Sequence, residues 1–321
     1  MLARRSLLAA AALAPLAAQA QDAYPSRPIR IVIAYPPGGS TDVLGRAIAQ
    51  RLSEMWNGAA VVVENRAGGA AIIGTQAVAQ AAPDGYTLAL GNNQTHASNQ
   101  AMARTLPYHA IDSFTPIARL ASVHHALIVP ANGARTLQEL VAKGTGGGRV
   151  TYASTSVGSA SHVIGESLAR RFGMDATHVP YRGGAPAVQD AVAGTVPLFM
   201  SNVVIISQHI AAGTLRPLGV TTRGETRHVP GVRSFAQQGV GDFEAPTWWA
   251  FLGRAGTPQP ILDRMHQALT SVLNEPAVKQ RIEQQGCDIV AGSPEQCRQF
   301  LAAEIDKWGA VIRANNITAD S

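Results

Sequence analysis

The stretch of sequence that decides the fold is Ile31-Val32-Ile33-Ala34-Tyr35-Pro36-Pro37-Gly38-Gly39-Ser40-Thr41-Asp42. A short β-branched run enters a Pro-Pro-Gly-Gly turn, and apolar residues at helical spacing follow, from Leu44 to Met55. This order predicts a strand, a tight turn and a helix. The glycines let the backbone approach a bound group, and the hydroxyl and carboxyl side chains after them are good helix caps. Because a helix N-terminus offers unpaired N–H groups and the positive end of its dipole, we expect an anion such as a carboxylate to bind there.

A second turn of this kind lies in the middle of the chain, at Gly158-Ser159-Ala160-Ser161. One such turn alone is more often a capped connection that binds nothing. Two of them favour a site in which both turns face one small anionic molecule. Helix starts and neutral donors hold a carboxylate without a buried counter-charge, whose desolvation is costly.

Strands and helices alternate along most of the chain. Strands are predicted at residues 31–34, 60–64, 86–90, 150–153, 178–181, 198–201, 215–220 and 248–253, with helices between most of them. This alternation predicts an α/β fold of mostly parallel sheets flanked by helices. The remainder of the chain is expected to be helical. Its last helix starts at a capping box formed by Ser293 and Gln296, and its apolar face is expected to pack on the first sheet.

We therefore predict two lobes joined by two crossings. The first lobe comprises residues 21–124 and 250–321, and the second comprises residues 125–249. A cleft between the lobes, where strand ends and helix starts meet, is the expected ligand site.

The first 20 residues have the pattern of a signal peptide. Arg4 and Arg5 precede an apolar run, and small residues lead up to Gln21. The arginine pair fits both general secretion and the twin-arginine route, and either route predicts a periplasmic protein. The net charge of +5 includes these two arginines. No basic run with interleaved aromatic residues occurs, which argues against a nucleic-acid partner.

The sequence contains two cysteines, Cys287 and Cys297. In an oxidising compartment they are expected to form a disulfide that closes a short loop. The alternative is two partly buried thiols.

Signals for catalysis or for a metal or cofactor are weak. No Gly-x-Ser-x-Gly motif occurs, and the Gly-Gly-Ser-Thr turn lacks the lysine of a phosphate-binding loop. Ser161 and His162 are neighbours on a predicted helix, so their side chains diverge and cannot form a nucleophile–base pair. The pair His124-His125 lacks the spacing of a metal site. We predict a protein that is not an enzyme and has no metal or cofactor.

A set of motifs, in order over nearly the whole mature chain, resembles the Bug family, the TctC-like extracytoplasmic solute receptors of tripartite tricarboxylate transporters. The motifs are Tyr24-Pro25-Ser26-Arg27-Pro28-Ile29-Arg30, Pro36-Pro37-Gly38-Gly39-Ser40-Thr41-Asp42, Val63-Glu64-Asn65-Arg66, Pro83-Asp84-Gly85-Tyr86-Thr87, Gly158-Ser159-Ala160-Ser161-His162, His178-Val179-Pro180-Tyr181-Arg182-Gly183 and Gly213-Thr214-Leu215-Arg216. The resemblance implies a type II periplasmic binding protein fold that closes on a small organic acid.

The resemblance also implies which residues bind the carboxylate. In the first lobe these are Tyr35, Gly39, Ser40, Thr41 and Asp42, and in the second lobe Ser154, Thr155, Gly158, Ser159, Ala160, Ser161, Tyr181 and Ser201. For Asp42, ligand contact and helix capping are equally weighted alternatives. Ser201 stands where relatives usually carry an acidic residue, so we expect a preference for simple carboxylates over amino acids.

The family resemblance predicts a monomeric receptor that delivers its ligand to membrane transporter subunits. A sensory subunit that signals to a membrane kinase is the alternative from another class. A secreted hydrolase using the same cleft is disfavoured, because the sequence shows no nucleophile–base pair.

Overall fold

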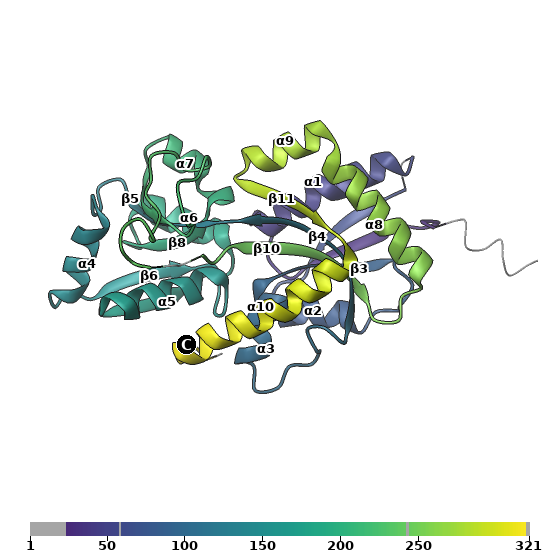
Figure 1. The fold of residues 1–321 in the computed structure, drawn as a ribbon, viewed down its shortest axis with the longest axis horizontal. Coiled ribbons are helices and arrows are strands. Elements are labelled where there is room, and N and C mark those ends of the chain that lie inside the picture. The colour runs from purple at the N-terminus through teal and green to yellow at the C-terminus, as the bar shows by residue number, and fades with distance from the viewer. Residues whose placement is uncertain (1–23, 58, 242–243, 319–321) are drawn as a thin grey trace, which may run out of the picture.

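The protein has two lobes, each built on one sheet (Figure 1). The computed structural model describes residues 24–57, 59–241 and 244–318. The predicted signal peptide, residues 1–20, lies outside this range. No helix in the described ranges is both long enough and apolar enough to cross a membrane.

The first lobe contains a six-stranded sheet in the order β11-β4-β10-β3-β1-β2. Its strands are β1 (Ile29–Ile33), β2 (Val61–Asn65), β3 (Thr87–Asn92), β4 (Phe114–Val123), β10 (Thr247–Arg254) and β11 (Cys287–Gly292). Strand β1 pairs in parallel with β2 and β3, whereas β10 is antiparallel to β3 and β4, and β11 is antiparallel to β4.

The second lobe contains a five-stranded sheet in the order β7-β6-β8-β5-β9. Its strands are β5 (His125–Pro130), β6 (Val150–Ser154), β7 (Ala176–Pro180), β8 (Phe199–Asn202) and β9 (Leu215–Val220). Here β6 is parallel to β7 and β8, and β5 is antiparallel to β8 and β9.

Both sheets are therefore mixed, and the expectation of mostly parallel sheets was wrong. Every antiparallel pair includes β4, β5 or β10, which are the strands next to the two places where the chain crosses between the lobes. Only His124 separates β4 from β5, and β10 brings the chain back to the first sheet. Three strands, β4, β5 and β11, were missed in the sequence. Pro116 and Arg119 interrupt the apolar pattern of β4, and β11 is a partly exposed edge strand.

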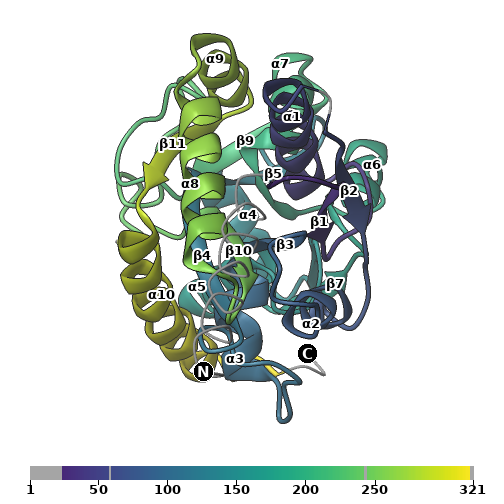
Figure 2. The same cartoon turned by 90° about the vertical axis from the view of Figure 1, so that its right-hand side faces the viewer.

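Helices cover both faces of each sheet. In the first lobe, α1 (Ser40–Met55) and α8 (Gln259–Asn274) cover one face, while α2 (Ile72–Ala79), α3 (Asn99–Met102) and α10 (Pro294–Ala314) cover the other (Figure 2). Helix α9 (Pro276–Gln284) packs beside β11. In the second lobe, α4 (Leu137–Thr145) and α5 (Ala160–Phe172) lie on one face, and α6 (Gly184–Ala193) and α7 (Ser207–Ala211) lie on the other. A π-helical turn, η1 (Gln94–Ser98), follows β3, and a 3-10 turn, η2 (Val203–Ile205), follows β8.

The last helix, α10, begins as predicted and joins the lobes. Ser293 Oγ accepts a hydrogen bond from the Gln296 N–H, and Gln296 Oε1 accepts one from the Ser293 N–H, which completes the capping box. The helix packs on β4 of the first sheet. At its end, Asn315 Nδ2 donates to Ser167 Oγ of α5 over 3.1 Å.

The structure does not form the expected disulfide. Cys287 and Cys297 are both buried free thiols. Cys287 packs in the core shared with α8, whereas Cys297 packs in the core shared with Trp248 and Trp308, on the opposite face of the same sheet. The short sequence separation of the two cysteines did not indicate that they lie on opposite faces of the sheet, because the strand β11, which begins at Cys287, was not predicted.

Candidate functional site

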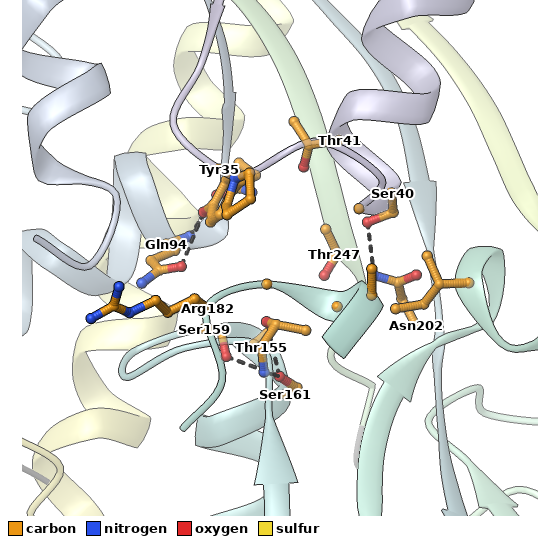
Figure 3. A pocket seen from close by; sticks show the side chains of 18 of the residues that line it. Tyr35, Ser40, Thr41, Gln94, Thr155, Ser159, Ser161, Arg182, Asn202 and Thr247 are labelled. Carbon is orange, nitrogen blue, oxygen red and sulfur yellow. Dashed lines mark hydrogen bonds between the residues drawn. The ribbon is translucent and has the colours of Figure 1, made fainter. Parts of the chain in front are cut away.

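The candidate site is a small cavity between the two lobes, with a volume of about 60 Å³ (Figure 3). By volume it has room for roughly four to six water molecules. The first lobe contributes Tyr35, Pro36, Pro37, Gly39, Ser40, Thr41, Asn92, Asn93, Gln94 and Thr247 to the lining. The second contributes His125, Thr155, Ser159, Ala160, Ser161, Arg182, Gly183, Gly184, Ala185, Pro186, Asn202 and Ile205.

Three helices begin at this cavity. Helix α1 starts at Ser40 after the N-cap Gly39, α5 starts at Ala160 after the N-cap Ser159, and α6 starts at Gly184. The first N–H groups of a helix have no partner within the helix and carry its positive dipole end. The two turns predicted from sequence thus converge on one space, and the start of a third helix, which was predicted as a helix but not as part of the site, joins them.

Asp42 stabilises the first turn through hydrogen bonds to its carboxylate. Its carboxylate accepts hydrogen bonds from the Gly38 N–H at 3.0 Å, from Asn65 Nδ2 at 2.9 Å and from Arg46 Nε at 3.0 Å. Burial alone would raise the pKa of Asp42, but these hydrogen bonds and the Arg46 charge together hold it below its usual value. Asp42 is not part of the cavity lining. The geometry supports neither alternative, because the carboxylate does not line the cavity and does not cap α1, but holds the turn at Gly38 that precedes the helix.

Hydroxyl groups organise the second turn. Ser159 Oγ caps α5 by accepting from the His162 N–H at 3.2 Å, and Ser161 Oγ accepts from the Thr155 N–H at 2.9 Å. Ser161 Oγ also lies 2.9 Å from Ser159 Oγ. Gly158 has a φ of +74°, and a Cβ there would lie 2.0 Å from Cε of Met102 in the first lobe. A glycine at this position therefore lets the lobes pack closely.

Five of the predicted binding residues do not line the cavity: Asp42, Ser154, Gly158, Tyr181 and Ser201. Ser154 Oγ donates to the Ser156 carbonyl and lies 2.6 Å from His178 Nε2. The Tyr181 hydroxyl donates to Asp190 over 2.6 Å. Burial and this carboxylate raise the pKa of Tyr181 to about 12. The other predicted residues, Tyr35, Gly39, Ser40, Thr41, Thr155, Ser159, Ala160 and Ser161, all line it.

The residue of β8 that reaches the cavity is Asn202, not Ser201. Ser201 is fully buried, and its hydroxyl donates to the Asn202 carbonyl. Asn202 Nδ2 donates to Ser40 Oγ over 2.9 Å and so bridges the lobes. Ser201 therefore does not contact the cavity in this structure, and the expected effect of this residue on ligand preference has no direct contact to support it.

Several lining residues were missed in the sequence. Asn92 ends the buried strand β3, Asn93 and Gln94 follow it, and polar side chains at the end of such a strand were a usable signal. Asn93 Oδ1 accepts from the Trp248 N–H, which ties this loop to β10. His125 and Thr247 lie at the two crossings, and nothing in the local sequence marks them as neighbours.

The cavity carries no negative charge, since none of its lining residues is acidic. Arg182 is exposed at its edge (Figure 3). Burial lowers the pKa of His125 to about 3, so this ring is neutral. Its Nδ1 lies 3.2 Å from the Ala245 carbonyl oxygen, and its Nε2 lies 3.3 Å from Thr247 Oγ1. The surroundings suit an anion and oppose a buried cation.

The geometry offers no nucleophile–base pair at Ser161. His162 Nδ1 accepts from the Gly158 N–H at 3.0 Å, and its ring stacks on His178 with centroids 3.7 Å apart. Burial and the His178 charge lower the pKa of His162 to about 3. Within residues 24–57, 59–241 and 244–318, no group of three or more histidine, cysteine or acidic side chains could hold a metal ion.

Comparison with known proteins identifies the family. The model of the tripartite tricarboxylate transporter family receptor, TctC, matches residues 44–317. The chain belongs to this receptor family. Protein BugT of Bordetella pertussis is 34% identical over 295 residues, which cover 91% of this chain and 90% of BugT. The resemblance seen in the sequence motifs is thereby confirmed.

Solved receptor structures confirm the two-lobed fold. An R. palustris protein with adipate is 30% identical, with a TM-score of 0.88 over 92% of this chain and 99% of that one. MatC from Rhodopseudomonas palustris with bound malate is 26% identical, with a TM-score of 0.84 over 90% of this chain and 99% of MatC. The family consists of periplasmic solute-binding receptors rather than enzymes, and its members bind small organic acids and work with transporter components.

Proposed function

We propose that this protein is a periplasmic receptor that captures a small carboxylate in the cavity between its lobes and delivers it to a tripartite tricarboxylate-type transporter. The observation that carries the proposal is the convergence of three helix N-termini, from both lobes, on one cavity without an acidic side chain. Backbone N–H groups at the starts of α1 and α5, with the hydroxyls of Ser40, Thr155 and Ser159, are the proposed carboxylate ligands.

The proposed ligand class is an organic acid without an ammonium group. An α-ammonium group in this cavity would be buried without a carboxylate partner, and an unpaired buried charge is strongly unfavourable. The adipate and malate bound by the two solved relatives are acids of this class. The periplasmic location rests on the family and on the signal-peptide pattern of residues 1–20.

Native mass spectrometry of the freshly purified protein tests the proposal, because a closed receptor retains its ligand. We expect a bound species that is released on denaturation and is identified as a carboxylic acid. Calorimetric titration with succinate, malate, adipate and aspartate then tests the class. Binding of one or more of the first three acids with much weaker binding of aspartate is the expected result. Tight binding of aspartate with no response to the other acids contradicts the proposal.

A further inference from the structure

Gln94 has a position that the proposed function does not yet use. It is the first residue of η1, one residue beyond the loop position Asn93 that follows β3, and it is 2% exposed. Its carboxamide makes four hydrogen bonds. Oε1 accepts from the hydroxyls of Tyr35 at 3.0 Å and Ser156 at 2.8 Å, and Nε2 donates to the carbonyl oxygens of Val157 at 2.7 Å and Ala70 at 3.2 Å. Because carbonyl oxygens only accept, the two contacts of Nε2 fix the orientation of the amide.

Three of these bonds connect the two turns that form the proposed anion site. Tyr35 belongs to the turn that leads into α1, and Ser156 and Val157 belong to the loop that leads into α5. Figure 3 shows Gln94 beside Tyr35 at one end of the cavity. The bonds to Tyr35 and Ala70 stay within the first lobe, whereas the bonds to Ser156 and Val157 cross to the second. One neutral side chain therefore sets the position of one helix start relative to the other.

A second carboxamide bridges the lobes at the other end of the cavity, but it is less complete. Asn202 Nδ2 donates to Ser40 Oγ, while Asn202 Oδ1 is buried without a hydrogen-bond partner. An unsatisfied buried acceptor offsets much of what the single bond contributes. Of the two bridges, the one made by Gln94 is therefore expected to dominate.

We propose that Gln94 is the positioning residue that aligns the α1 and α5 helix starts on a shared carboxylate when the lobes are closed. This inference rests on the proposed receptor function. A carboxamide suits the task because it holds both turns without a charge that would compete with the bound anion. An apparent affinity scales with the fraction of protein in the binding-competent arrangement, so loss of the bridge weakens binding of every acid by the same factor.

A double-mutant cycle tests the inference. The variants are Q94M, which keeps the length of the side chain, S156A, which removes one inter-lobe bond outside the cavity lining, and the double variant. T145A is the matched control, because its hydroxyl bonds only within α4. Calorimetric titration with succinate, malate and adipate gives the affinity of each protein.

We expect Q94M to weaken binding about 5- to 150-fold, since two inter-lobe hydrogen bonds are lost, and S156A to weaken it about 2- to 13-fold. The double variant should bind like Q94M alone, because the Ser156 bond needs Gln94. For a given variant, the factor should be the same for each acid that binds, and T145A should match the wild type. A factor that differs strongly between acids marks Gln94 as a ligand contact and overturns the inference. Wild-type affinity in S156A, or additive losses in the double variant, also overturns it.

A ligand-independent measurement separates this inference from the receptor proposal. If the wild type binds none of the acids, the receptor proposal fails for them, and the role of Gln94 is judged by hydrogen exchange. Amides of residues 155–161 should then exchange several-fold faster in Q94M than in T145A. Equal exchange in the two variants overturns the inference.

Discussion

Replacement of Asp42 by asparagine tests the support of the first turn. Asp42 is 4% exposed, and its carboxylate accepts from Gly38, Arg46 and Asn65. Asparagine has one acceptor oxygen, and its NH2 group faces the remaining donors. At least one donor then loses its acceptor, and a hydrogen bond to a charged group contributes about 1.5–3 kcal/mol. The Arg46 side chain is 52% exposed, so loss of its ion pair adds only about 0–1 kcal/mol.

We expect D42N to lower the free energy of unfolding by about 1–4 kcal/mol at pH 7, measured by urea denaturation followed by circular dichroism. R46A, which removes only the exposed partner, should cost about 1 kcal/mol or less. The pKa of Asp42 is lowered in the folded protein, so its contribution is complete above the usual aspartate pKa and is lost as the pH falls through the lowered value. The difference between wild type and D42N should therefore be constant from pH 7 to 5 and shrink below pH 4. Unchanged stability at pH 7 together with altered selectivity among acids would refute this reasoning and make Asp42 a ligand contact.

Three further outcomes follow from buried groups. Glu304 Oε2 accepts from the indole N–H groups of Trp248 and Trp308 at 2.7 Å each. E304A should lower the unfolding free energy by about 2–5 kcal/mol and E304Q by much less, because glutamine keeps an acceptor; equal losses would contradict this. Burial raises the pKa of Cys287 and Cys297 to about 12, so a thiol reagent at pH 8 should detect neither in the native protein and both after denaturation without reductant. No thiols after denaturation would show a disulfide. Burial lowers the pKa to about 3 for the histidines His96, His125 and His162. As the pH falls, these histidines are protonated in the unfolded chain before they are protonated in the folded protein. The unfolding free energy should therefore fall between pH 7 and 5 by on the order of 1–2 kcal/mol per histidine. A constant value would mean that the histidines are protonated in the folded protein.

The two turns at residues 36–42 and 158–161 could be predicted because their chemistry is local. Glycines, hydroxyl side chains and the helical spacing that follows them specify a strand–turn–helix unit without reference to the rest of the chain. The capping box at Ser293 was recognised for the same reason. Eight of the predicted binding residues, all in or near these two turns, line the cavity.

The rest of the cavity depends on how distant segments meet. Gln94 reaches the loop before α5 only because η1 packs beside the second lobe, and no local pattern encodes that contact. At β8, the choice between Ser201 and Asn202 is a shift of one residue, and in a strand such a shift reverses the face to which a side chain points. The edge strand β11 lacks a clear alternation, so no sequence pattern indicates that Cys287 and Cys297 face opposite sides of one sheet.

A crystal structure of the protein with its retained or added organic acid would show whether the helix starts of both lobes hold one carboxylate. We expect one carboxylate between the lobes, within hydrogen-bond distance of N–H groups in the first turns of both α1 and α5, with Gln94 joining Tyr35 to the loop before α5. An acid bound elsewhere, for example in the groove between α5 and α10, with the inter-lobe cavity left to water, would contradict it.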